Sequence, residues 1–348
     1  MSNNPSSFRQ YSTQISSALP KPALEWRARA FETSVTQENH DRLLSESKVF
    51  DAVRIIEKKD QKALTKKNIR IASWNLERCK KIKPSAELIK KNKVDICLLT
   101  EMDLGMARSQ NLDTTSVMSD LLNMSQAYAV EFIELGLGDK KEQQEFNGIS
   151  NSWGLHGNGI LSSFPIVQSA VLPLDPGGLW FNQETAIDQR RIGGRMAVAV
   201  CLLMPKPVWF VAVHYESLLG PKERELETQN LLQQIHSLCG DSPVMIGGDF
   251  NCRGLLEKGL KGIEILNRPQ DAEPMFQSFL EHGFEWKDSN LSEPTTRNHP
   301  WINEPLKKID WFFTKGLKCS NPIVIPAVDE TNENLSDHEM ILVDVSFD

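Results

Sequence analysis

From residue 68 onward, apolar strand-like runs alternate with helical segments. Residues 208–213 (Val-Trp-Phe-Val-Ala-Val) are apolar at every position, which predicts a strand that is covered on both faces. Residues 221–238 begin with Pro221 at a favoured first-turn position and carry apolar residues at helical spacing. This alternation predicts an α/β domain with two or more layers and excludes an all-β sandwich.

The expected strands cover residues 69–74, 94–100, 127–134, 158–163, 166–174, 195–203, 208–214, 243–248, 308–314, 321–328 and 339–347. The expected helices cover residues 84–92, 114–124, 221–238 and 272–282. Residues 135–157 are rich in Gly, Lys and Glu and predict a long surface loop, and a second loop is expected near 285–307.

The first 66 residues differ in composition from the rest. Residues 1–22 are polar and end in two prolines, which predicts a flexible arm. Residues 24–66 contain helix-forming residues, and Val49, Val53 and Ile56 have helical spacing. We therefore expect a flexible arm and a helical extension over residues 1–66, with the extension packed on a main domain at residues 67–348. The alternative is a helix that contacts a partner or a membrane through residues 24–66.

Charge and cysteine usage limit the class of protein. The net charge of −7 argues against sequence-blind binding to a phosphate polymer, although a local basic rim is compatible with it. None of the six cysteines has C-x-x-C spacing, so we expect free thiols and a reducing compartment. The sequence shows neither a secretory signal peptide nor an apolar run of about 18 residues. These features predict a cytoplasmic protein without a transmembrane segment.

Several apolar runs end in, or lie beside, a side chain that can bind a metal or a proton. Taken alone, each has an ordinary explanation, such as a turn residue or a solvated acid. Carboxylates that converge on one site would require a cation, and oxygen ligands select magnesium, manganese or calcium. The set predicts metal-assisted hydrolysis of a phosphate ester. Its members are Asn75, Glu101, His214, Asp249, Asn251, Asp310, Asp337 and His338.

In this order the polar residues resemble the motifs of the endonuclease/exonuclease/phosphatase (DNase I-like) superfamily. The resemblance covers about residues 68–348. It rests on segments ending in Asn75 and Glu101, on Gly157-Asn158-Gly159-Ile160-Leu161-Ser162, on Val213-His214, on Gly248-Asp249-Phe250-Asn251, on Ile309-Asp310 and on Ser336-Asp337-His338. It implies a four-layer α/β sandwich with two central mixed β-sheets, here with an N-terminal helical extension.

The resemblance also implies roles for individual residues. Glu101 is the expected principal metal ligand, with Asn75 and Asp337 nearby. Asp249 and Asn251 are expected to position water and phosphate, while His214, and His338 oriented by Asp310, contact the phosphate or exchange protons. The general base stays unassigned, because such groups titrate as a coupled set. Magnesium is the expected ion, with manganese next and calcium less favoured.

One departure from the superfamily pattern concerns positive charge. Ser163 stands where many relatives carry arginine, and Arg191 and Arg195 are candidates to replace that charge at the phosphate. Asn158 of the Gly-Asn motif is a further candidate for phosphate binding. The alternative for these arginines is a solvated hairpin or a set of salt bridges.

The substrate is only partly constrained by the sequence. Lys308-Ile309-Asp310 lacks the pattern of inositol 5-phosphatases, and a secreted sphingomyelinase would have an export signal. Residues 214–224 resemble a bacterial branch of the superfamily to which no substrate is assigned. We expect a phosphodiesterase more than a monoesterase, acting on a nucleic acid, a phospholipid headgroup or a small phosphodiester. The alternatives are a nuclease acting on DNA or RNA and a catalytically silent binding module.

Overall fold

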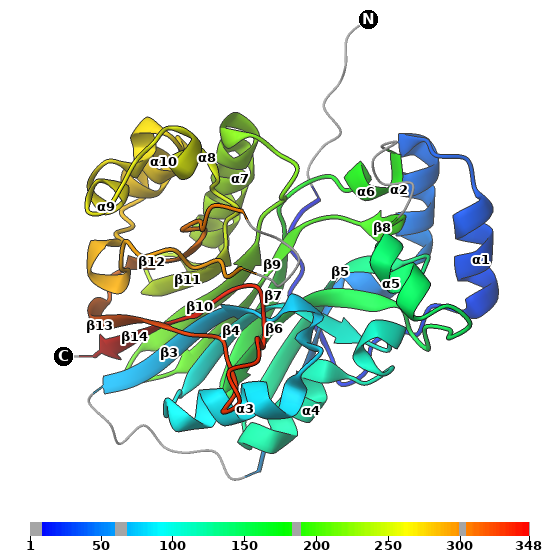
Figure 1. Cartoon of the computed structure of the whole chain (residues 1–348), viewed down its shortest axis with the longest axis horizontal. Helices are drawn as coiled ribbons and strands as arrows, with labels where there is room; N and C mark the ends of the chain where they lie inside the picture. The colour runs from blue at the N-terminus through cyan, green and yellow to red at the C-terminus, as the bar shows by residue number, and fades with distance from the viewer. Residues whose placement is uncertain (1–8, 60–67, 183–188, 299–303, 348) are drawn as a thin grey trace, which may run out of the picture.

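The computed structural model describes residues 9–59, 68–182, 189–298 and 304–347. Figure 1 shows two sheets packed face to face. The nine-stranded sheet has the order β1-β2-β5-β6-β4-β3-β14-β13, with β8 paired to β5, and the five-stranded sheet has the order β12-β11-β10-β9-β7. The strands are β1 Gln14–Ser16, β2 Ala52–Ile56, β3 Asn68–Asn75, β4 Ile96–Leu104, β5 Ser125–Glu134, β6 Leu155–Ser162, β7 Ile166–Pro173, β8 Arg191–Gly193, β9 Met196–Leu203, β10 Pro207–His214, β11 Val244–Asp249, β12 Asp310–Lys315, β13 Lys318–Ile325 and β14 Met340–Ser346.

Helices cover the outer face of each sheet, which gives the four layers that the family resemblance implied. In Figure 1, α3 and α4 lie under the nine-stranded sheet, and α7 and α10 lie over the five-stranded one. The helices are α1 Leu24–Glu32, α2 Gln37–Glu46, α3 Ile82–Lys91, α4 Thr114–Leu122, α5 Lys140–Glu145, α6 Leu179–Asn182, α7 Pro221–Cys239, α8 Gly254–Glu257, α9 Glu264–Asn267 and α10 Met275–Glu281. In the described part of the chain, none of them has the length and apolar character of a membrane-crossing helix.

Strand β10 shows why its sequence is apolar throughout. Its side chains alternate between two cores: Phe210 packs between the sheets, while Val211 packs under the helices of the outer layer. A strand with apolar cover on both faces gains burial energy at every position. Every strand and helix expected between residues 69 and 347 is present, with shifts of a few residues at the ends. The expected loop at 135–157 also contains α5 and the start of β6.

The helix prediction for residues 24–66 is wrong at its C-terminal end. After α1 and α2, residues 48–50 form a 3₁₀ turn and residues 52–56 form β2, which pairs antiparallel with β5. Val53 lies in the core between the sheets. Residues 60–66 of the expected helix lie outside the described residues. Pairing with β5 outweighs the helical spacing here, because β-branched side chains pack well on the surface of a sheet.

The expected flexible arm also contacts the body where the structure describes it. Ser12 pairs with Val171 of β7, and β1 pairs parallel with β2. The helices α1 and α2 lie beside β8 and α6, at one end of the molecule (Figure 1). Residues 9–56 therefore complete one edge of the nine-stranded sheet, and the remainder of the predicted arm, residues 1–8, lies outside the described residues.

Candidate active site

The strand directions bring the predicted polar residues to one edge of the sandwich. The parallel strands β3 and β4 deliver Asn75 and Glu101 at that edge. In the other sheet, parallel β10 and β11 place His214 opposite Asp249 in register. Asp310 begins the antiparallel strand β12 opposite Asp249. Side chains separated by up to 263 positions in sequence, from Asn75 to His338, thus meet around Asp249.

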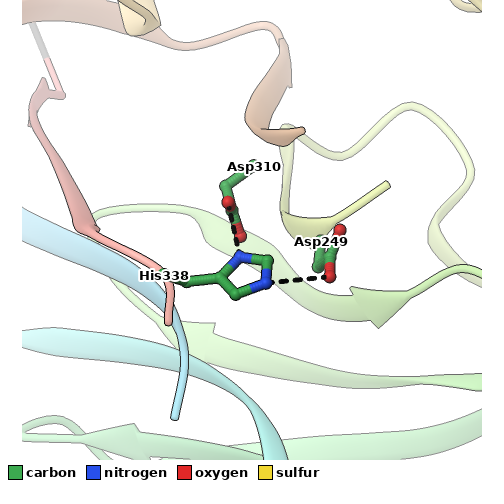
Figure 2. A group of neighbouring side chains, drawn as sticks. All are labelled: Asp249, Asp310 and His338. Carbon is green, nitrogen blue, oxygen red and sulfur yellow. Dashed lines mark hydrogen bonds and ion pairs between the residues drawn. The ribbon is translucent and has the colours of Figure 1, made fainter. Parts of the chain in front are cut away.

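An imidazole held between two carboxylates forms the centre of this site (Figure 2). His338 Nδ1 lies 2.8 Å from Asp310 Oδ2, and His338 Nε2 lies 3.7 Å from Asp249 Oδ2. Burial opposes the imidazolium, but the two carboxylates raise the pKa of His338 well above its ordinary value. Burial raises the pKa of Asp249 to about 7. Asp249 can therefore exchange a proton near neutral pH, which suits acid–base chemistry.

The turn that carries His338 is tied to the end of β3. Ser336 Oγ donates to the carbonyl of Asn75 at 2.6 Å and accepts from the His338 amide at 3.1 Å. Trp74 Nε1 donates to the carbonyl of His338 at 2.9 Å. These bonds join the Ser-Asp-His segment to a buried strand, so the imidazole is held by rigid backbone on both sides.

Glu101 is presented by an irregularity in β4. The register with β6 shifts between Leu99 and Met102, and Glu101 has a left-handed φ of 57°. Such a conformation costs a non-glycine residue about 1 kcal/mol or more and is concentrated at functional sites. The bulge turns the carboxylate toward the cavity, where Glu101 Oε1 accepts from Asn75 Nδ2 at 3.2 Å. The same amide donates to Asp249 at 3.2 Å.

The oxygen donors at this position fit a hard divalent cation. Glu101 and Asp337 supply carboxylate oxygens and line the cavity. The side-chain oxygen of Asn75 accepts from the Glu77 amide at 3.1 Å, so its Nδ2 faces Glu101 instead. Burial opposes ionisation of Glu101, but the charge of Arg78 holds its pKa well below the usual value, so the carboxylate is ready to bind a cation. Arg78 Nη1 lies 3.5 Å from Glu101 Oε2.

Asp249, Asp310 and His338 also offer ligand atoms within 4.8 Å of one another. The carboxylates on both sides of His338 favour its protonated form, and a protonated ring has no free nitrogen lone pair for a metal.

Asn251 and His214 complete the set. The amide of Asn251 donates to Asp249 Oδ1 at 2.9 Å, and its side chain donates to the carbonyl of Tyr215, also at 2.9 Å. His214 Nε2 lies 3.7 Å from Asp249 Oδ2. His214 Nδ1 lies 2.9 Å from Arg195 Nη1. Burial, assisted by the charge of Arg195, lowers the pKa of His214 well below its ordinary value.

These groups face a cavity of about 340 Å³ with a basic rim. The volume is that of a small-molecule site. Cations outnumber carboxylates among the described lining residues, in contrast to the net charge of the whole chain. The cations are Arg78, Arg191, Arg195, Arg253, Arg297 and Lys307, and the carboxylates are Glu101, Asp249, Glu304 and Asp337.

The three residues predicted to bind phosphate are placed differently from one another. Arg191 and Arg195 line the cavity, but each is paired with buried carboxylates, so the salt-bridge alternative describes them well. Asn158 is fully buried, and its amide donates to Glu131 at 3.1 Å and to the carbonyl of Met196 at 3.0 Å. These contacts place Asn158 behind the cavity wall and give its predicted phosphate contact no support.

The tryptophans at 153, 180 and 286 differ in how they relate to the cavity. Trp286 is buried and donates to the carbonyl of Leu266 at 2.9 Å, while Trp153 packs against the helix-covered core of the nine-stranded sheet. Trp180 lines the cavity and donates to Glu216 at 2.7 Å. Trp301 lies outside the described residues.

A network of buried charges behind the site escaped the sequence analysis. Arg108 forms a bidentate pair with Asp103 at 2.8 and 2.9 Å and contacts Glu142 at 3.0 Å. His156, which lines the cavity, lies 2.8 Å from the same aspartate. Arg78 reaches Glu142 at 3.1 Å and so joins this network to Glu101. The sequence offers one indication of this network, which is that Arg78 follows Asn75 by three residues.

Known proteins share this fold at low sequence identity. A structure from Bacteroides vulgatus, described as an endonuclease/exonuclease/phosphatase, is 17% identical, with a TM-score of 0.53 over 81% of this chain and 100% of that one. The human Nocturnin catalytic domain with bound sulfate is 16% identical, with a TM-score of 0.54 over 83% and 97%. The mannosyl-6-phosphatase Bt3783 of Bacteroides thetaiotaomicron is 15% identical, with a TM-score of 0.51 over 80% and 100%.

A search of curated proteins finds no match. The profile of the Endonuclease/Exonuclease/phosphatase family matches residues 72–338, from the first motif strand to the terminal histidine. The match includes Asn75, Glu101, Asp249 and His338, which the fold gathers at one edge. The chain therefore belongs to the endonuclease/exonuclease/phosphatase family.

Proposed function

We propose that the chain is a divalent-metal-dependent phosphoesterase that hydrolyses a phosphodiester by in-line attack of water. Family members are hydrolases that act on phosphate esters. The observation that carries the proposal is the position of the His338–Asp310 pair. It lies beside Asp249 in the same cavity as Glu101, under a basic rim that attracts an anion.

Each residue has a role that follows from its contacts. Asp249, whose burial raises its pKa to about 7, is the candidate to accept a proton from water, and Asn251 fixes its orientation. His338, charged between two carboxylates, stabilises negative charge that develops on the phosphate. The rim cations hold the rest of the substrate anion.

Glu101 and Asp337 are the proposed ligands of a magnesium or manganese ion, with Asn75 held beside Glu101, since family enzymes generally use divalent metals. When bound, such an ion supplies charge compensation for a phosphate oxygen. Glu101 is the key donor because it is the cavity carboxylate held by the β4 bulge.

The remaining proposals concern location and organisation. All six cysteines are free and five of them are buried, which supports a cytoplasmic, reducing location. We infer that residues 67–348 carry the catalytic machinery, because every polar side chain of the site lies there. A partner contact through residues 24–66 stays a prediction.

Hydrolysis of bis-p-nitrophenyl phosphate with magnesium, with manganese and with EDTA tests this function. We expect metal-dependent turnover in the wild type and a loss of at least about 100-fold in Glu101→Ala, because charge stabilisation dominates such catalysis. Glu264→Gln is the matched control, since this exposed carboxylate lies on α9 and pairs with Arg268 one helical turn away. The same assay with p-nitrophenyl phosphate separates diesterase from monoesterase activity.

A panel of plasmid DNA, RNA, sphingomyelin and inositol phosphates then identifies the substrate class. Preferred cleavage of plasmid DNA or RNA would support the nuclease alternative. Folded wild-type protein that turns over none of these substrates would refute the proposal in favour of a binding module.

A further inference from the structure

Arg195 lies in the cavity wall against an imidazole of the site. It directly precedes β9, and its side chain is 4% exposed. Arg195 Nε donates to Glu216 at 3.0 Å, and Arg195 Nη1 donates to Glu131 at 3.2 Å. Two buried carboxylates therefore compensate its charge and fix its plane.

The same Nη1 atom lies 2.9 Å from His214 Nδ1. A guanidinium has only hydrogen-bond donors, so a contact at this distance requires an unprotonated Nδ1 that accepts. The ring proton of His214 is therefore on Nε2, on the side of Asp249, whose Oδ2 lies 3.7 Å away. His214 is therefore a neutral imidazole that can donate from Nε2. A second proton, on Nδ1, would point an N–H at the guanidinium of Arg195.

His338 has the opposite arrangement around the same carboxylate. Its Nδ1 faces Asp310 and its Nε2 also lies 3.7 Å from Asp249 Oδ2. Two acceptors favour the imidazolium for His338, whereas the donor beside His214 excludes it. His214 and His338 therefore differ in charge, because Nδ1 of His214 faces a guanidinium whereas Nδ1 of His338 faces a carboxylate.

We propose that Arg195 is a positioning residue that fixes His214 as a neutral Nε2–H donor, so that His214 donates a hydrogen bond to the substrate phosphate and transfers no proton. This inference rests on the proposed function for its phosphate. The predicted phosphate contact of Arg195 is replaced by an action through His214.

Nitrogen-15 spectra of histidine-labelled protein test the assignment without substrate. His214 is identified by the signal that is lost in His214→Gln. We expect an unprotonated Nδ1 and a protonated Nε2 from about pH 5.5 to 8, a range around the ordinary histidine pKa. In Arg195→Met the donor is gone and Glu131 lies 3.7 Å from Nδ1, so we expect the imidazolium signal to appear as the pH is lowered across this range.

Kinetics of bis-p-nitrophenyl phosphate hydrolysis supply the second test. Glutamine can present an N–H near the position of Nε2, so His214→Gln is expected to stay within about tenfold of wild-type kcat. Loss of the donor in His214→Ala should cost about 100-fold. His338→Gln should lose about 100-fold or more, because an amide cannot carry the charge.

A protonated Nδ1 on His214 in the wild type would overturn the assignment, whatever the activity. Equal losses in His214→Gln and His214→Ala would overturn the donor role. If the wild type shows the expected tautomer but hydrolyses no phosphate ester, the proposed function fails while the action of Arg195 on His214 stands.

Discussion

Replacing Arg78 with glutamine should tighten the binding of a divalent cation. Arg78 Nη1 lies 3.5 Å from Glu101 Oε2, and the two side chains are 20% and 18% exposed. An arginine at this distance competes with a metal for the same carboxylate. Two unit charges about 4 Å apart interact by roughly 4 kcal/mol near a protein surface with an effective dielectric constant of about 20.

Only part of this interaction energy should appear as a gain in metal-binding free energy. Arg78 is also balanced by Glu142 at 3.1 Å and Asp139 at 3.7 Å, and solvent screens the partly exposed pair. We therefore expect a gain of about 1–2 kcal/mol in Arg78→Gln, which is a fall of roughly 5- to 30-fold in the Kd for Mn²⁺.

Isothermal titration of Mn²⁺ into metal-stripped protein measures this change directly. Lys80→Gln is the matched control, because Lys80 reaches Glu142 at 3.4 Å but forms no ion pair with Glu101 in the described part of the chain. We expect less than about a twofold change for this partly exposed pair. An unchanged or weaker affinity in Arg78→Gln would show that Arg78 orients Glu101 rather than competing for it.

Three further changes test other parts of the structure. Asp310→Asn removes the carboxylate that accepts from His338 at 2.8 Å, so kcat should fall about 100-fold with little change in KM; an unaltered kcat would contradict the pairing. In Gly248→Ala the new Cβ would lie 1.8 Å from the carbonyl oxygen of Val213, so urea denaturation should show a loss of about 1–3 kcal/mol, whereas wild-type stability would refute the close approach. Burial lowers the pKa of Lys308 from 10.5 to about 8, so the unfolded state binds more protons between these values and stability should rise with pH there; Lys308→Met should abolish that increment in urea titrations, and an identical rise in the variant would disprove it.

The layers could be predicted because strands and helices produce regular patterns of apolar residues in the sequence. The apolar run at 208–213 and the amphipathic helix at 221–238 each report local structure and burial together. The same reasoning led to a wrong prediction for residues 52–56, since Val49, Val53 and Ile56 also have helical spacing. Their true partner is β5, about 70 residues away, which no local period reveals.

The convergence of site residues was predictable for a different reason. Polar side chains at the ends of buried strands share an edge once the strands run in register, as His214 and Asp249 do. The charges behind them were not predictable. Arg78 and Arg108 have no period and no motif of their own, and their burial is tolerated only because carboxylates from distant segments meet them in space.

The pairing of Ser12 with Val171 has a consequence for biosynthesis. At about 5–20 residues per second, a ribosome completes the partner of Ser12 on the order of ten seconds after Ser12 itself. Arg54 is likewise synthesised before Tyr128, its partner in β5. The segment that contains Ser12 and Arg54 thus emerges before the strands it pairs with, and a nascent chain arrested before residue 171 should expose it to proteases and chaperones.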